Sequence, residues 1–262
     1  MMEYTFISGA TGGIGKAFAY QLASKGAPLF LTGRDHEKLC ALKEDIVNHY
    51  GVDVSVFACD LTNENSRAQM VDYIRANDLR FCRIVHVAGV DTQMPFMEYK
   101  ENKVLMQIRV NAEATIFLTR ALLNFRASDV EVICISSMSG QTPMPYFALY
   151  SASKAMLTNF FTSLHYELKK DRVKVTTIIP GGVYTRHDVI EQIKGQGLWG
   201  KLTAKQPEFI AKKSLIAVRR NKVKYIPGFF NRFLNVIMKI LPKKLVLSFI
   251  AKRWKKERKD AF

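Results

Sequence analysis

The sequence has little cysteine and no long, uninterrupted apolar run. Its four cysteines, Cys40, Cys59, Cys82 and Cys134, follow no metal-ligand or redox spacing, so we expect free thiols, no metal site and a reducing compartment. The longest uncharged run, residues 132–153, contains prolines and serines, which argues against a membrane span there. The first residues lack the pattern of a secretory signal. A cytoplasmic protein is therefore expected.

Acidic residues are scarce in the last quarter of the chain. Residues 1–194 hold 21 Lys/Arg and 20 Asp/Glu, whereas residues 195–262 hold 18 Lys/Arg and only 3 Asp/Glu. The net charge of +16 is thus a property of the C-terminal segment and not of the body. No nucleic-acid-binding motif accompanies this charge, so a nucleic-acid partner is not predicted.

The chain of 262 residues, with 48% hydrophobic and 24% charged residues, has the composition of a globular protein. Short β-branched runs alternate with segments of helical period from about residue 4 to residue 226. This order predicts a doubly wound, mostly parallel α/β sheet of the Rossmann type, with its ligand beyond the carboxyl ends of the strands. We divide the chain into a dinucleotide-binding catalytic domain, 1–228, and a basic, amphipathic helical extension, 229–262.

A glycine-rich turn follows the first predicted strand. It reads Ser8-Gly9-Ala10-Thr11-Gly12-Gly13-Ile14-Gly15 and leads directly into a predicted helix. The glycines at positions 9, 13 and 15 permit a tight turn and a close backbone approach to a pyrophosphate, while the helix N-terminus offers N–H groups to the anion. A strand before the motif and a helix after it are the context that distinguishes a dinucleotide site from a simple connection.

The end of the second predicted strand indicates which dinucleotide is bound. An acidic residue there would bind a ribose 2′-hydroxyl and repel a 2′-phosphate. This chain has Gly33 and Arg34 instead, which offer space and a guanidinium for a phosphate. NADP(H) is the predicted cofactor, although Asp35 could partly neutralise Arg34.

A tyrosine and a lysine four residues apart open the longest predicted helix. At this spacing Tyr150 and Lys154 share one helix face, and a nearby ammonium is expected to lower the pKa of the phenol. Ser137 follows the preceding strand and can hydrogen-bond a substrate carbonyl oxygen. Its neighbour Ser136 should project to the opposite side of the sheet. This arrangement makes Tyr150 a candidate acid–base group.

Taken together, these motifs resemble those of the short-chain dehydrogenase/reductase family over residues 4–226. Asn111 matches the asparagine of a family helix. The family's Asn-Asn-Ala-Gly segment appears as His86-Val87-Ala88-Gly89, with both asparagines replaced. The cofactor-binding residues that the resemblance implies are Gly9, Thr11, Gly13, Ile14, Gly15, Arg34, Asp60, Leu61, Ala88, Gly89, Tyr150, Lys154, Pro180, Gly181, Val183 and Thr185.

The resemblance also implies a mechanism. Ser137 would hold the carbonyl oxygen, Tyr150 would donate the proton, and Lys154 would lower the tyrosine pKa and bind the nicotinamide ribose. Asn111 would hold a water molecule that resupplies the proton. For substrate contact we expect Met138, Phe147 and Tyr184.

The C-terminal extension combines apolar helix faces with lysine, arginine and a tryptophan. This is typical of a helix in a membrane interface, but the same faces could pack on the body, cap the substrate cleft or form a subunit contact. A lipophilic substrate is expected if the extension lies in a membrane interface or caps the substrate cleft.

The expected function is that of a hydroxysteroid dehydrogenase-like enzyme; a 3-oxoacyl-thioester or other long-chain ketone reductase is the alternative. The resemblance implies a homodimer or homotetramer, and a non-catalytic nucleotide-binding scaffold is the alternative from another class.

Overall fold

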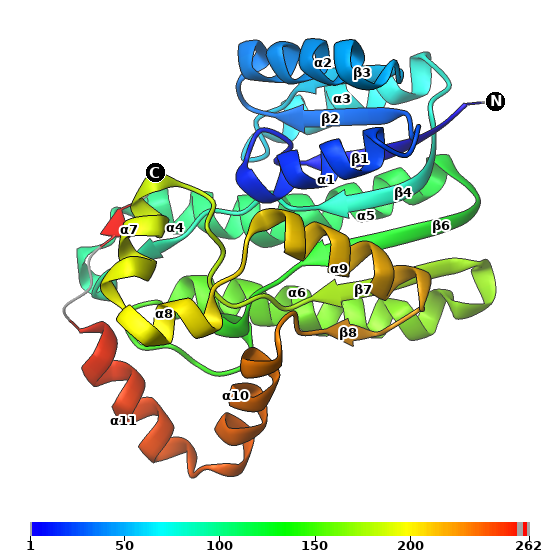
Figure 1. Cartoon of the computed structure of the whole chain (residues 1–262). Coiled ribbons are helices and arrows are strands. Elements are labelled where there is room, and N and C mark those ends of the chain that lie inside the picture. Colours follow the sequence, from blue (N-terminus) through cyan, green and yellow to red (C-terminus); the bar gives the residue numbers. More distant parts are fainter. Residues whose placement is uncertain (1, 256–258, 261–262) are drawn as a thin grey trace.

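The computed structural model describes residues 2–255 and 259–260. Seven parallel strands form one sheet in the order β3-β2-β1-β4-β6-β7-β8, with helices on both faces (Figure 1). This confirms the predicted doubly wound α/β sheet. The strands of the sheet are β1 (Glu3–Ser8), β2 (Leu29–Gly33), β3 (Val54–Ala58), β4 (Arg80–His86), β6 (Arg126–Ile135), β7 (Val173–Ile178) and β8 (Lys224–Tyr225).

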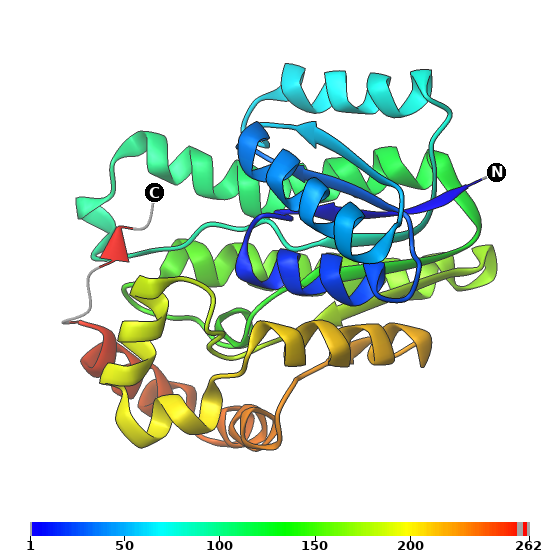
Figure 2. The same ribbon diagram turned by 45° about the horizontal axis from the view of Figure 1, so that its top comes forward.

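Alternating side chains of each strand face two separate cores, because successive residues point to opposite sides of a sheet. Ile7 belongs to one core and its neighbour Phe6 to the other. The first core packs under α1 (Gly13–Ala23), α2 (His36–Tyr50) and α9 (Pro207–Arg219). The second packs under α3 (Glu64–Ala76), α5 (Ala114–Leu122) and α6 (Ala148–Glu167), and Figure 2 shows these two helix layers on either side of the sheet.

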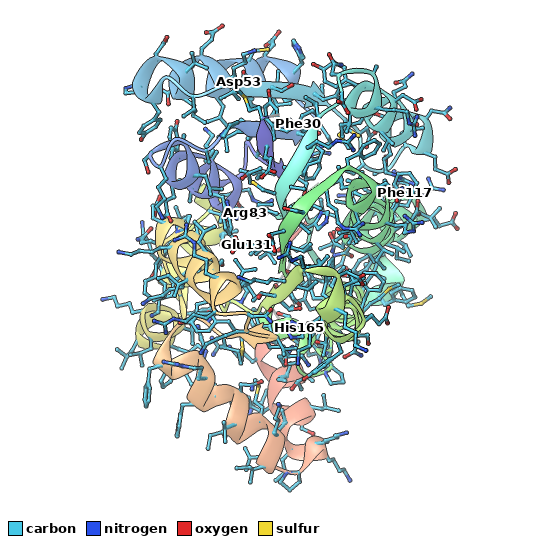
Figure 3. All side chains as sticks on the ribbon, turned by 90° about the vertical axis from the view of Figure 1, so that its right-hand side faces the viewer. Phe30, Asp53, Arg83, Phe117, Glu131 and His165 are labelled. Carbon is cyan, nitrogen blue, oxygen red and sulfur yellow. The ribbon has the colours of Figure 1, made fainter. Side chains whose placement is uncertain are left out.

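Charged side chains stabilise the edge of the sheet where the strands begin. Arg83 on β4 pairs with Glu131 on β6 at 2.6 Å, and both side chains are largely buried. Figure 3 looks at this edge and shows the two residues next to each other on neighbouring strands. In sheets of this kind ligands bind at the opposite edge, where the strands end.

The helix between β4 and β6 is not uniform. α4 (Glu101–Ile108) continues into a π-helical turn, Arg109–Glu113, before α5 begins. A π-turn adds a residue to one helical turn and often marks a functional position. Here it carries the fully buried Asn111.

The segment after β7 is helical although it contains three glycines, Gly195, Gly197 and Gly200. It forms two short helices, α7 (His187–Gly195) and α8 (Gly197–Thr203). Gly197 connects them with a φ of +58°, a conformation that favours glycine. The two helices lie on the side of the sheet where the strands end (Figure 1).

The C-terminal extension is helical, as predicted. α10 (Phe229–Ile240) and α11 (Lys243–Trp254) form a hairpin that turns at Pro242 and projects below the body of the molecule in Figure 1. The chain then returns, and β9 (Lys259–Asp260) pairs antiparallel with β5 (Thr92–Gln93), which follows β4. Among the described residues, no helix combines the length and the apolar character that a membrane span requires.

Candidate active site

A large cavity of about 920 Å³ lies at the carboxyl ends of the strands. It is lined by the loops that follow β1, β4, β6 and β7 and by residues of α7, α8, α10 and α11. Its volume is near the upper end of the range for small-molecule sites, roughly 300–1,000 Å³. The structure therefore brings the sequence motifs and the C-terminal hairpin to one chamber.

The glycine turn is shaped by backbone contacts that leave no room for side chains. Gly9 has a φ of +65°, and a Cβ added to it would lie 2.9 Å from the backbone of Ala88. A Cβ on Gly15 would overlap the carbonyl oxygen of Gly9. Gly9 and Gly13 line the cavity together with Thr11 and Ile14, whereas Gly15 supports the turn from behind.

The N-terminus of α1 faces this turn. No described side chain caps the helix, whose N-cap residue is Gly12. The first N–H groups of a helix have no partner within the helix and carry a partial positive charge. The turn and this helix end thus form a cradle that fits a pyrophosphate.

Ser8, at the end of β1, holds the next loop in place. Its hydroxyl accepts hydrogen bonds from the N–H groups of Val87 and Ala88, at 3.2 and 3.3 Å. Ala88 and Gly89 both line the cavity. The Ser8 hydroxyl thus ties the glycine turn to the loop after β4, a role that its place in the motif did not reveal.

Arg34 lies at the end of β2, is exposed and lines the cavity. The neighbouring Asp35 carboxylate caps α2, accepting from the Lys38 backbone N–H at 3.0 Å, and pairs with the Lys38 ammonium at 2.7 Å. These contacts direct Asp35 toward its own helix. Arg34 itself lines the same cavity as the glycine turn.

Two further predicted cofactor residues are placed differently from each other. Leu61 lines the cavity, whereas Asp60 is not among the residues that line it. The Asp60 carboxylate accepts from the backbone N–H and hydroxyl of Thr62, at 2.9 and 2.8 Å. Asp60 thus orders the loop that presents Leu61.

The segment after β7 closes another wall. Pro180, Gly181, Val183 and Thr185 all line the cavity. The carbonyl oxygen of Pro180 accepts from the Met138 N–H at 2.8 Å, which joins this wall to the loop after β6.

Tyr150 stands in the first turn of α6, and Ser137 faces it from the loop after β6. Both side chains line the cavity, and Ser137 lies close enough to act on the pKa of Tyr150. Ser136 points the other way, where its hydroxyl donates to the Lys154 carbonyl oxygen at 2.8 Å. The structure therefore brings Ser137, and not Ser136, to the tyrosine.

Lys154 is buried one helical turn after Tyr150. Its ammonium donates to the Ile135 carbonyl oxygen at 3.0 Å and lies 5.7 Å from the centroid of the Tyr150 ring. Burial lowers the pKa of Lys154, because a low-dielectric surrounding disfavours its charged form.

The pKa of Tyr150 does not follow the expectation. Burial raises it, the negative charge of Asp91 raises it further, and Ser137 and Arg186 lower it. Desolvation thus outweighs the effect that was expected from the lysine. A phenol with a raised pKa is protonated at neutral pH, which is the form that donates a proton.

Asn111 fastens the loop that follows β4. Its Oδ1 accepts from the Val90 N–H at 2.7 Å, and its Nδ2 donates to the Val90 carbonyl oxygen at 2.9 Å and to the Ser153 hydroxyl at 3.1 Å. The π-turn directs the side chain toward this loop. The amide is thus a clamp between the cofactor loop and the start of α6.

The three expected substrate contacts separate in the structure. Met138 and Phe147 line the cavity, and the Phe147 ring stacks on Tyr150 with centroids 4.5 Å apart. Tyr184 is not among the residues that line the cavity, and its contact with substrate stays a prediction. Its neighbours Val183 and Thr185 line the cavity, so alternation along this extended segment turns Tyr184 the other way.

Sequence reasoning missed a charged pair at the cavity wall. Asp91 and Arg186 both line the cavity, and Arg186 Nη2 lies 3.3 Å from Asp91 Oδ1. The only sequence signal was their position, directly after the motif segments Ala88-Gly89-Val90 and Val183-Tyr184-Thr185. The pair borders the reacting centre, because both charges act on the pKa of Tyr150.

The C-terminal hairpin contributes an apolar end to the cavity. The structure thus places the extension over the cleft, one of the roles left open by the sequence. The apolar lining residues of the hairpin are Leu234, Ile237, Met238, Leu241, Leu245, Val246, Phe249 and Ile250.

A model of the short chain dehydrogenase family matches residues 3–192. The chain belongs to this family. It is 30% identical over 195 residues to a very-long-chain 3-oxoacyl-CoA reductase of Candida glabrata, covering 68% of this chain and 55% of the relative. It is 32% identical over 188 residues to the human inactive hydroxysteroid dehydrogenase-like protein 1, covering 70% and 56% of the two chains. The chain thus spans little more than half the length of these relatives.

Solved structures show the same fold. One, from work on the stereoselectivity of a 7beta-hydroxysteroid dehydrogenase, has a TM-score of 0.84 at 22% identity and covers 95% of this chain and 96% of that chain. Another, a short-chain dehydrogenase from Sphingobium yanoikuyae in complex with NADPH, has a TM-score of 0.76 at 21% identity over the whole of both chains. The likeness to these structures confirms the fold, and the match to the family model assigns the chain to the short chain dehydrogenase family.

Proposed function

We propose that the chain is an NADPH-dependent reductase of a ketone carried on a long apolar chain, with 3-oxoacyl thioesters as the substrate class. The observation that carries the proposal is the continuous cavity. It runs from the glycine turn, past Tyr150, to the apolar side chains of α10 and α11. One chamber can therefore hold a dinucleotide, a reacting carbonyl and an apolar tail.

The residues present fit the cofactor. The cradle formed by Gly9, Gly13 and the N-terminus of α1 would hold the pyrophosphate, and Arg34 would hold the 2′-phosphate. When bound, the nicotinamide supplies the hydride. The NADPH in the Sphingobium yanoikuyae structure supports this assignment by analogy of fold.

Three side chains would act on the substrate carbonyl. Ser137 donates a hydrogen bond to the carbonyl oxygen and holds it beside Tyr150. Tyr150, whose phenol is protonated at neutral pH, donates its proton to the oxygen as the alcohol forms. Lys154 carries a positive charge close to the phenolate that remains, and this charge stabilises it.

The substrate class follows from the far end of the cavity. Each methylene of an apolar chain that leaves water contributes about 0.8 kcal/mol, so the hairpin lining favours long chains. The very-long-chain 3-oxoacyl-CoA reductases among the relatives support this choice. A hydroxysteroid, our first expectation, would use the same apolar end and is the second candidate.

A non-catalytic scaffold is the competing role, and one human relative carries the word inactive in its name. Against it, the cavity brings together Ser137, Tyr150 and Lys154. Groups that serve only to bind a nucleotide would not require a phenol at this place.

The test is oxidation of NADPH with 3-oxoacyl thioesters of increasing chain length, with steroid ketones alongside. We expect kcat/KM to rise with acyl length and NADPH to be preferred over NADH. Tyr150→Phe should bind NADPH as the wild type does but lose turnover. Binding of NADPH without turnover of any ketone would support the scaffold instead.

A further inference from the structure

α10 is apolar on two adjacent faces, and only one of them serves the cavity. Phe229, Phe233, Val236 and Ile240 are 78%, 51%, 52% and 73% exposed. Their spacing places them on one side of the helix, and none of them lines the cavity. We call these four residues the outer stripe.

The outer stripe lies within a strongly basic segment. Residues 229–255 contain seven lysines and arginines and no acidic residue. On α10 itself, Arg232 and Lys239 are exposed, and their positions in the helix place them along one border of the stripe. On α11, Lys244 and Lys252 are exposed as well. Apolar and cationic side chains thus share the outer surface of the hairpin.

The same surface contains an edge of the cavity. Leu245 and Phe249, one turn apart on α11, line the cavity and are 64% and 62% exposed. Side chains that face both the chamber and the surroundings mark an opening. This opening lies on the hairpin that carries the outer stripe and projects beyond the body (Figures 1 and 3).

We propose that the α10–α11 hairpin lies in the surface of an anionic lipid bilayer and that the cavity opens into that surface. The outer stripe would enter the boundary between headgroups and acyl chains, with the cationic side chains at the level of the anionic headgroups. An apolar substrate could then pass from the bilayer to Tyr150 without crossing water. This second part rests on the proposed function; the binding to lipid does not.

Charge favours a bilayer over a second copy of the chain as the partner of this surface. A symmetric contact between two hairpins would bring two sets of seven cationic residues together without an acidic residue between them, and like charges oppose such a contact. An anionic bilayer supplies the opposite charge and an apolar layer at once. The homo-oligomer that family resemblance implies would then form through other faces.

The first experiment is flotation of the full chain with phosphatidylcholine vesicles that contain or lack phosphatidylserine. We expect binding to the anionic vesicles, and weaker binding when salt is raised or phosphatidylserine is omitted. Failure of the wild type to float with anionic vesicles would overturn the proposal.

Two sets of variants assign the binding to the hairpin. Phe229→Ser/Phe233→Ser/Ile240→Ser should reduce partitioning roughly tenfold or more by removing buried apolar area. The matched control, Leu105→Ser/Met156→Ser/Tyr166→Ser, removes three side chains on α4 and α6 that are 54%, 52% and 65% exposed and should bind as the wild type does. Equal loss in both triple variants would refute the assignment to the hairpin.

The cationic residues are tested by Lys243→Gln/Lys244→Gln/Lys252→Gln. Since each lysine near an anionic surface contributes about 1 kcal/mol, binding to phosphatidylserine vesicles should fall by roughly a hundredfold. Binding to neutral vesicles should change little. Light scattering of the wild type and the stripe variant completes the test. A dimeric wild type and a monomeric stripe variant that float equally well would mean that a second copy of the chain, and not a bilayer, covers this surface.

The opening is tested by the way the substrate is presented. With a long-chain 3-oxoacyl ester dissolved in anionic vesicles, the stripe variant should lose at least tenfold in turnover. With a short, water-soluble ketone it should match the wild type, because the outer stripe does not line the cavity. Equal turnover of both proteins on the vesicle-borne substrate would contradict entry from the bilayer. If the wild type reduces neither ketone, the proposed function fails while flotation still decides the lipid contact.

Discussion

Replacing Asn111 by leucine tests whether the buried amide is the clamp of the cofactor loop. The side chain is fully buried and accepts from the Val90 N–H at 2.7 Å. Leucine has a similar size but offers no acceptor. The Val90 N–H would then be left buried without a partner, while its carbonyl oxygen keeps the hydrogen bond from Gln107 at 3.2 Å.

The expected cost follows from this difference. One buried donor left unpaired costs about 1–3 kcal/mol, whereas the carbonyl oxygen stays satisfied and adds little. For a chain of this size that corresponds to a melting temperature lower by roughly 2–10 °C. Because Val90 follows Ala88 and Gly89 in the cavity wall, binding of NADPH should weaken as well.

Thermal unfolding followed by circular dichroism measures the first effect, and NADPH fluorescence the second. Ser153→Ala is the control, since it removes one acceptor of the Asn111 amide while the two contacts with Val90 remain. We expect less than half the loss seen for Asn111→Leu. An Asn111→Leu protein that melts with the wild type and binds NADPH equally well would refute the clamp.

Three further predictions concern separate parts of the molecule. Arg34→Ala should raise KM for NADPH by roughly ten- to a hundredfold, because a hydrogen bond to a charged group contributes about 1.5–3 kcal/mol. In the same steady-state assays KM for NADH should not change. Equal effects on both cofactors would refute the phosphate contact. Burial lowers the pKa of His86 from 6.5 to about 3. Between these two pH values the unfolded chain binds more protons than the folded protein, so stability is lost as the pH falls. The expected loss is about 2 kcal/mol between about pH 7 and pH 5. Urea unfolding at the two pH values should show this loss, and His86→Asn should reduce it; the same pH dependence in both proteins would contradict the assignment. Ile237→Trp, which fills the apolar end of the cavity, should lower kcat/KM for long acyl chains at least tenfold and spare short ones, whereas a uniform loss would argue against a chain-binding role of α10.

The fold and the centre of the site could be predicted because local patterns determine them. Buried strands and amphipathic helices follow from hydrophobic periodicity, and the glycine turn, Ser137, Tyr150 and Lys154 occupy positions set by the strands they follow and by one helical turn. The division into 1–228 and 229–262 remains a prediction. So do the catalytic roles, until variants are measured.

The rest depends on contacts between distant segments. Asp91 and Arg186 meet across two loops, and no local pattern announces such a pair. The direction of the Tyr150 pKa depends on how deeply the phenol is buried, which spacing does not reveal. The orientation of Tyr184 depends on the phase of alternation in one short extended segment. The hairpin faces could be recognised as apolar from sequence, but the structure was needed to show that one of them closes the cavity.

The central claim is that Tyr150 protonates a ketone at the end of a cavity built for an apolar chain. The most direct measurement is single-turnover reduction of a long-chain 3-oxoacyl thioester by the NADPH-loaded protein, with Tyr150→Phe alongside. We predict that the wild type forms the 3-hydroxyacyl product and that the variant, with unchanged NADPH affinity, forms at least a hundredfold less in the same time. Equal product from both proteins would contradict the role of Tyr150, and product from neither would contradict the reductase itself.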